Sequence, residues 1–207
     1  MNQPLHFSAA ADDREEIARA EVYGLLAQLF YSAPDAELYA QLQVAPTEAP
    51  ARGAWLEASW SEVVAASRRL SRQAVADEFD ALFVSIGKPE IFLYGSHHIA
   101  GALNEKPLVA LRDTLRELGL ERAETMAETE DHLAYLCEVM RFLIAGDDLA
   151  VSNLATQQRF FNQHLRGWVG ALWQQLAAHP RADFYRALAR FAAEFFAVEE
   201  QAFDMLD

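Results

Sequence analysis

Residues Glu128 to Met140 read ETEDHLAYLCEVM, an acidic cluster that runs directly into an apolar helical pattern. The apolar residues at helical spacing, which predict one buried stripe, are Leu133, Leu136, Cys137, Met140 and Ile144. Ahead of them Thr129 can cap a helix, and Glu130 and Asp131 fall in its first turn, where the helix dipole favours carboxylates. The pattern therefore predicts a helix that begins at Thr129 and holds the Asp131-His132 pair at its mouth.

Length, charge and cysteine usage limit what the chain can be. It has 207 residues, the size of one domain, which buries roughly 70% of its unfolded surface. The single cysteine, Cys137, lies on the apolar stripe, so we expect a buried thiol in a reducing compartment and not a nucleophile. We find no export signal at the N-terminus and no segment of membrane-spanning length, so we expect a cytoplasmic protein without stable membrane insertion. The net charge of −14 disfavours nucleic acid and favours a cationic partner.

Helical periodicity continues along most of the chain, and no segment alternates with period two for long enough to predict a strand. The expected helical segments are residues 12–31, 35–42, 54–70, 71–83, 107–118, 129–145, 154–176 and 184–203. We therefore predict an all-α, single-domain bundle that spans residues 1–207 and has roughly nine to eleven helices. Gly146, Asp147 and Asp148 form a polar break between two long apolar segments. A hinge near 146–152 could open there, so we expect a monomer that can also form a domain-swapped dimer.

The most irregular stretch is Ser85 to Ser96, SIGKPEIFLYGS, in which glycines and a proline forbid a continuous helix. Its apolar residues require either that it fills the core or that it forms part of a ligand groove. His97 and His98 follow it, but adjacent histidines on a helix point about 100° apart and have no partner at ligand spacing. We expect no metal and no cofactor, and a binding protein is favoured over an enzyme because no catalytic motif is present.

Four motifs carry a resemblance to a known family. They are Phe79-x-x-Leu82-Phe83 followed by Gly87, Tyr94-Gly95-Ser96, Glu128-x-x-Asp131-His132, and Phe161-x-x-His164-Leu165-x-x-Trp168. In this order and spacing the chain resembles the TorD/DmsD/NarJ family of redox-enzyme maturation chaperones, specifically its TorD/DmsD branch. One departure is Thr129, because the family typically has proline between the glutamate and the Asp-His pair.

The resemblance implies an all-α cytoplasmic chaperone for a molybdenum enzyme. Such proteins bind the twin-arginine signal peptide of the apoenzyme and hold it back until the molybdopterin cofactor is inserted. That peptide offers two arginines and then an apolar segment, so its receptor needs carboxylates beside an apolar groove. Glu128, Glu130 and Asp131 could supply the carboxylates. The peptide-binding residues expected from the resemblance are Leu82, Phe83, Phe92, Tyr94, Gly95, Ser96, Glu128, Asp131 and His132.

Alternatives remain open at this point. His132 could orient Asp131, respond to pH, or be a neutral structural histidine. The chain could also be an all-α scaffold or regulator whose polar motifs only cap helices. A hydrolase that uses Asp131 and His132 is a further alternative, although the sequence offers it no nucleophile or metal partner.

Overall fold

The described part of the chain consists of ten α-helices and one short π-helical segment. The computed structural model describes residues 11–48, 56–84, 88–123 and 126–206. The elements are α1 (Ala11–Tyr31), α2 (Ala36–Val44), α3 (Glu57–Arg69), α4 (Arg72–Phe79), η1 (Asp80–Val84), α5 (Gly95–Ala100), α6 (Lys106–Glu117), α7 (Leu133–Ala145), α8 (Leu154–His164), α9 (Val169–Ala178) and α10 (Phe184–Asp204). Within these ranges there is no strand, and the one isolated bridge joins Tyr94 to His132. The predicted all-α class and number of helices are confirmed.

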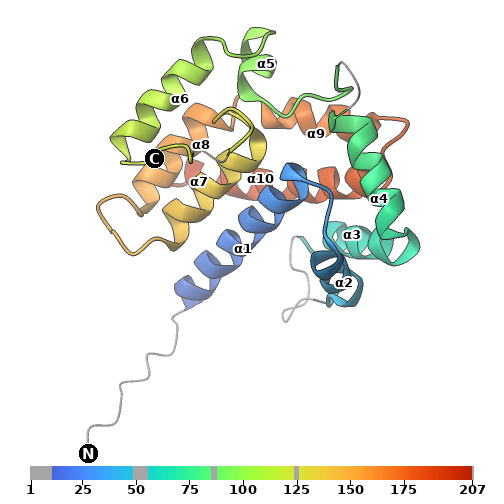
Figure 1. Cartoon of the computed structure of the whole chain (residues 1–207). Coiled ribbons are helices and arrows are strands. Elements are labelled where there is room, and N and C mark those ends of the chain that lie inside the picture. The colour runs from blue at the N-terminus through green and yellow to red at the C-terminus, as the bar shows by residue number, and fades with distance from the viewer. Residues whose placement is uncertain (1–10, 49–55, 85–87, 124–125, 207) are drawn as a thin grey trace, which may run out of the picture.

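A single hydrophobic core holds the bundle together. α1 packs along α7, while α10 lies behind them and packs against α3 and α9 (Figure 1). One cluster of buried side chains includes Leu42 of α2, Leu111 of α6 and Phe196 of α10. Cys137 belongs to the same cluster and is fully buried, as expected, and burial raises the pKa of its thiol. The core therefore joins helices from both sides of the predicted hinge.

A buried ion pair connects α1 to the C-terminal helices. Arg19 donates to both carboxylate oxygens of Glu199, at 2.6 and 2.9 Å, and to the side-chain oxygen of Gln157 on α8 at 3.1 Å. The Tyr23 hydroxyl also donates to Glu199, at 3.0 Å. Only 1% of Glu199 is exposed, so its charge depends on these partners and not on water.

One expected helix is divided in the structure. The expected segment 154–176 is divided into α8 and α9, because the Trp168 indole Nε1 donates to the His164 carbonyl at 2.7 Å and occupies the acceptor that ends α8. Gly167, a poor helix former, lies in the break. The break expected near Ser71 is confirmed, because the Ser71 hydroxyl accepts a hydrogen bond from the Ala74 amide and caps α4. Residues 54 and 55 of the expected third helix lie outside the described ranges.

The start of α7 was predicted wrongly. Thr129 does not cap this helix, and Glu130 and Asp131 do not form its first turn, because α7 begins at Leu133 with His132 as its N-cap. The Asp131 carbonyl and the Leu133 amide pair instead with the stretch around Tyr94, through Gly95 and Leu93. Long-range pairing thus prevails over a local signal for a helix start.

The connection between α7 and α8 is polar, as the break at Gly146 to Asp148 predicted, and its hinge role stays a prediction. The Asp148 carbonyl accepts from the amides of Val151 and Ser152, at 2.9 and 2.6 Å. A Cβ at Gly146 would lie 2.3 Å from the Ser152 hydroxyl and 2.8 Å from the Phe142 carbonyl, so only glycine fits there. None of the helices described is long and apolar enough to cross a membrane.

Candidate functional site

Two segments far apart in the sequence are joined by their main chains and build the site. We call residues 91–96 and 128–133 the paired segments. The Leu133 amide donates to the Leu93 carbonyl at 2.7 Å, and the Gly95 amide donates to the Asp131 carbonyl at 3.0 Å. This antiparallel join brings Tyr94 beside His132. The structure thereby places two of the four motifs of the sequence in direct contact.

Asp131 lies inside the join and not at the surface. Only 3% of the residue is exposed. One carboxylate oxygen accepts from the Ser96 amide at 2.8 Å, and the other accepts from the Thr129 hydroxyl at 2.6 Å. Asp131 therefore holds the start of α5 in place. It also accepts the hydrogen bond of the Thr129 hydroxyl, and Thr129 is the residue that stands in place of the family's usual proline.

His132 does not act as a partner of Asp131 in this geometry. Its ring Nδ1 accepts a hydrogen bond from the Ala134 amide at 3.2 Å, and its ring packs edge-on against Tyr94 at 5.0 Å. Burial lowers the pKa of His132 to about 4, against the opposing effect of Glu128 and Asp131. The imidazole is therefore neutral near pH 7, which favours the structural alternative and gives a hydrolase no Asp-His dyad.

The two other predicted carboxylates are both engaged. The Tyr94 hydroxyl donates a short hydrogen bond to the Glu128 carboxylate, and burial, with help from Glu128, raises the pKa of Tyr94. Glu130 accepts two hydrogen bonds from Arg112 on α6, at 3.0 and 2.8 Å. Hydrogen bonding to Arg112 holds the pKa of Glu130 below its usual range. A cationic ligand would have to share these carboxylates or displace their partners.

The predicted apolar residues separate into two groups. The Leu82 side chain is fully buried in the core, and only the Leu82 carbonyl meets the paired segments, where it accepts from the Ile91 amide at 3.0 Å. Phe83 packs edge-on against Phe79 at 5.2 Å and Tyr185 at 5.0 Å. Phe92 and Tyr94 are half-buried and do belong to them. The remaining predicted residues, Gly95, Ser96, Glu128, Asp131 and His132, lie there too.

Gly95 meets a fourth motif of the sequence. A Cβ at Gly95 would lie 3.3 Å from Nε1 of Trp168, so glycine allows the indole to pack against the backbone. His98 also packs against this indole, and its ring stacks on that of Trp168 at 5.1 Å. The motifs around Tyr94 and Trp168 are therefore parts of one packed unit.

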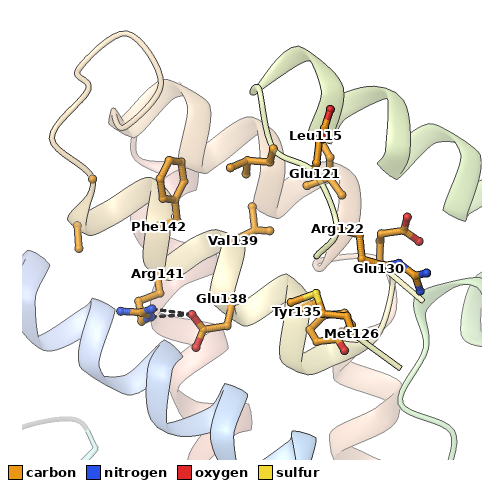
Figure 2. A pocket seen from close by; sticks show the side chains of 13 residues that line it. Leu115, Glu121, Arg122, Met126, Glu130, Tyr135, Glu138, Val139, Arg141 and Phe142 are labelled. Atoms are coloured by element: carbon orange, nitrogen blue, oxygen red, sulfur yellow. Dashed lines mark hydrogen bonds and ion pairs between the residues drawn. The ribbon is translucent and has the colours of Figure 1, made fainter. Parts of the chain in front are cut away.

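Sequence reasoning missed a groove that adjoins the paired segments at Glu130. This α6–α7 groove is about 390 Å³ in volume and lies between the end of α6, the residues that follow it and α7 (Figure 2). Its apolar lining consists of Leu115, Leu120, Met126, Tyr135, Val139 and Phe142, and its charged residues are Glu121, Arg122, Glu130, Glu138 and Arg141. Glu138 pairs with Arg141 at 2.8 Å. The sequence feature that could have indicated this groove is the helical spacing of Tyr135, Val139 and Phe142, which form a second apolar stripe on α7.

A second hollow lies between α5, α6, α8 and the residue that precedes His132. This α5–α8 pocket is about 490 Å³ in volume and more polar than the groove. His164 Nε2 lies 2.9 Å from the Thr114 hydroxyl, which also donates to the Ala110 carbonyl at 3.2 Å. Burial lowers the pKa of His164 to about 4, so its ring adds no charge to the pocket near pH 7. Ser96 and Asp131 line the same pocket.

An all-α bundle with a groove, a polar pocket and no Asp-His dyad among the described side chains has the features of a binding protein. Residues 48–174 match the family model described as nitrate reductase delta subunit, and the chain belongs to this family, that of the TorD/DmsD/NarJ redox-enzyme maturation chaperones. The chain is a TorD-type maturation chaperone and not an enzyme.

Individual relatives agree with this assignment. The chain is 28% identical over 204 residues to the chaperone protein TorD of two Vibrio cholerae serotype O1 strains, O395 and El Tor Inaba N16961, covering 91% of this chain and 93% of each relative. Its fold is similar to the crystal structure of a protein from Archaeoglobus fulgidus that is described as a redox enzyme maturation protein. That likeness has a TM-score of 0.58 at 16% identity and covers 95% of this chain and 99% of the other.

Proposed function

We propose that this chaperone binds the twin-arginine signal peptide and the apoprotein of a molybdopterin-dependent reductase in the cytoplasm, assists cofactor insertion, and delays export. The observation that carries the proposal is the α6–α7 groove, an apolar trough whose charged lining is three glutamates and two arginines. A signal peptide has the matching chemistry, because an apolar segment follows its two arginines. The molybdopterin in this scheme is the client's cofactor and not a resident group of the chaperone.

The apolar part of the groove supports binding of the peptide's hydrophobic segment. Phe142 is 42% exposed although it is a large aromatic residue, and Val139 and Tyr135 continue the same stripe inward. Exposed apolar surface of this kind is stabilised when an apolar helix or extended peptide covers it. The groove therefore offers a favourable place for the segment that would otherwise face water.

The charge of the chain supports binding of the cationic end. The net charge of −14 attracts a positively charged peptide over distances of about 10 Å at 0.1 M salt. Glu121 lies at the exposed rim of the groove, and Glu130 lies where the groove meets the paired segments. Exposed carboxylates of this kind contribute modestly to affinity and mainly to the rate of association.

The test is a titration of a fluorescent twin-arginine peptide into the purified chain at several salt concentrations. We expect binding that weakens as salt rises, because the carboxylate–arginine attraction is screened, with a remaining apolar share that resists salt. The variant Phe142→Ser should weaken binding about tenfold or more, since a buried aromatic contact is worth roughly 1.5–3 kcal/mol. Its matched control is Val109→Ser, which changes an apolar residue on α6 that is 56% exposed and lines neither hollow.

If no twin-arginine peptide binds at low salt, the proposed function is wrong, and the scaffold alternative gains support. If the peptide binds but Phe142→Ser and Val109→Ser behave alike, the chaperone binds its peptide elsewhere. A pull-down of the client from cells that respire without oxygen would then identify the reductase.

A further inference from the structure

An apolar cleft lies between α1 and α10, on a different part of the molecule from the α6–α7 groove. We call it the α1–α10 cleft, and it consists of two hollows of about 300 and 480 Å³ that share Ala18, Val22 and Leu56. No residue that lines it among those described also lines the α6–α7 groove or the α5–α8 pocket. A ligand of this cleft could therefore bind without touching either of the other two sites.

The walls of the cleft are two stretches of helix that run in opposite directions. On α1, Ala18, Val22 and Leu25 follow one another at helical spacing and form one stripe. On α10 the wall extends from Phe191 to Phe203, which is about 18 Å at the rise of an α-helix. The cleft is thus long enough for about three turns of a further helix.

Contacts within the walls keep the cleft open and apolar. The Tyr23 ring of α1 packs edge-on against Phe195 of α10 at 4.9 Å, so the two walls touch directly. At one end the Trp60 ring packs against Phe191 at 5.3 Å. At the other end Leu154 and Leu206 are 45% and 49% exposed. Exposed apolar surface with a polar margin is typical of an interaction site.

The charged lining of the cleft is acidic. The glutamates that line it are Glu15 and Glu21 on α1, Glu48 after α2, and Glu57 on α3. None of these four carboxylates forms an ion pair with a basic side chain in the described part of the chain. The one basic residue among the described lining, Arg19, is already bonded to the buried Glu199. The free charge of the cleft is therefore negative in both hollows.

We propose that the α1–α10 cleft is a docking surface for a basic amphipathic helix of a partner protein. The apolar face of such a helix would cover Val22, Leu25 and Phe195, and its lysines or arginines would lie opposite Glu15 and Glu21. This inference goes beyond the proposed function, because the cleft and the α6–α7 groove share no residue. A twin-arginine peptide matches the cleft poorly, since its charge is at one end while the glutamates lie in both hollows.

Electrostatics disfavours the other occupants of such a surface. A second copy of the chain would bring a net charge of −14, and a nucleic acid or an anionic lipid surface would bring phosphates. Each of these would place like charges opposite the unpaired glutamates, which opposes both encounter and binding. A cationic helix has the opposite sign and a matching apolar face.

The probe for the test is a designed peptide of about 14 residues with leucine on one helical face and lysine on the other. Wild type should bind it at least about tenfold more tightly than the same peptide with glutamate in place of lysine, because like charges across an interface are unfavourable. A peptide with the same leucines and lysines in shuffled order should also bind more weakly, since it has no apolar face. Binding should weaken as salt rises.

Variants locate the probe on the protein. Ala18→Arg places a cation in the shared part of the cleft, so it should weaken probe binding about tenfold or more and leave the melting temperature unchanged, because Ala18 is exposed. Its matched control is Ala65→Arg, which changes an exposed alanine of α3 that lines neither hollow and should alter affinity less than about threefold. Glu21→Gln should weaken binding roughly threefold, and the exposed Glu37→Gln on α2 should not.

Separate outcomes decide the cleft and the proposed function. If wild type binds no probe, or if Ala18→Arg and Ala65→Arg behave alike, the cleft assignment is overturned. Probe binding that Phe142→Ser weakens and Ala18→Arg does not would place the probe in the α6–α7 groove and also overturn it. If the probe binds as expected while no twin-arginine peptide binds, the cleft stands and the proposed function fails.

Two controls test the other occupants. Light scattering of wild type and Ala18→Arg shows whether a second copy covers the cleft, and a wild-type dimer that this variant dissociates overturns the proposal. A probe that binds only after deletion of residues 1–10 would assign the cleft to the chain's own N-terminal segment and overturn it as well. A monomer that binds the probe equally with and without those residues supports the partner helix.

Discussion

Removal of Arg19 should reveal how much the stability of the bundle depends on the buried ion pair between Arg19 and Glu199. The change Arg19→Met keeps the length of the side chain and removes the charge. It leaves the Glu199 carboxylate 1% exposed, with the Tyr23 hydroxyl at 3.0 Å as its remaining donor. Loss of one partner from a buried pair typically costs about 3–5 kcal/mol. Because Tyr23 stays and the Arg19 side chain is 14% exposed, we expect the lower end, about 3 kcal/mol.

Urea unfolding followed by circular dichroism at pH 7 measures this loss, with Arg190→Met as the matched control. Arg190 pairs with Glu62 at 3.0 Å, but their side chains are 54% and 51% exposed, so the control should lose less than about 1 kcal/mol. The double variant Arg19→Met, Glu199→Met should recover much of the loss, since it leaves no unpaired buried charge.

The pH dependence gives a second check with a definite sign. Without Arg19, the buried Glu199 carboxylate has no basic partner, and burial disfavours its charged form. Protonation in acid removes this unpaired charge, so the variant should regain stability relative to wild type as pH falls from 7 toward 5. Equal losses for Arg19→Met and Arg190→Met at pH 7, with no such recovery, would refute the argument from burial.

Three further predictions concern single residues. Leu82→Ala should lower the free energy of unfolding by roughly 2–5 kcal/mol in urea and leave peptide affinity unchanged, because Leu82 is fully buried. A stable variant with weakened peptide binding would instead place Leu82 in the peptide-binding site. His132 should titrate near pH 4 by NMR, because burial lowers its pKa. Wild type should lose stability relative to His132→Asn as pH falls from about 6.5 toward 4, since the unfolded chain takes up the proton first. A titration midpoint near 6.5 would contradict the argument that burial lowers this pKa. Gly146→Ala should destabilise the closed monomer and increase a slowly exchanging dimer in size-exclusion chromatography with light scattering, whereas a strictly monomeric variant after refolding would argue against the hinge.

Sequence periodicity predicted most helices because each one buries a stripe of apolar residues on the core. The stripe of Leu133, Leu136, Cys137 and Met140 is buried as expected. Helix ends were harder to predict, since Thr129, Glu130 and Asp131 form an ordinary helix-start pattern. Their actual conformation depends on pairing with residues around Tyr94, and no local signal carries that information.

The resemblance grouped Tyr94, Ser96 and Asp131, and the structure places these residues side by side, while their role in peptide binding stays a prediction. It could not show that Asp131 is buried and bonded to the Ser96 amide, nor that Leu82 lies in the core.

The join between the paired segments also bears on how such a chaperone can diverge. Its hydrogen bonds, from Leu133 to Leu93 and from Gly95 to Asp131, use main-chain atoms that every residue except proline can supply in full. Side chains that project from the join can therefore change without opening it. One scaffold can then acquire preferences for different clients through substitutions in the hollows on either side, while its architecture persists at the 16% identity that separates this chain from the archaeal structure.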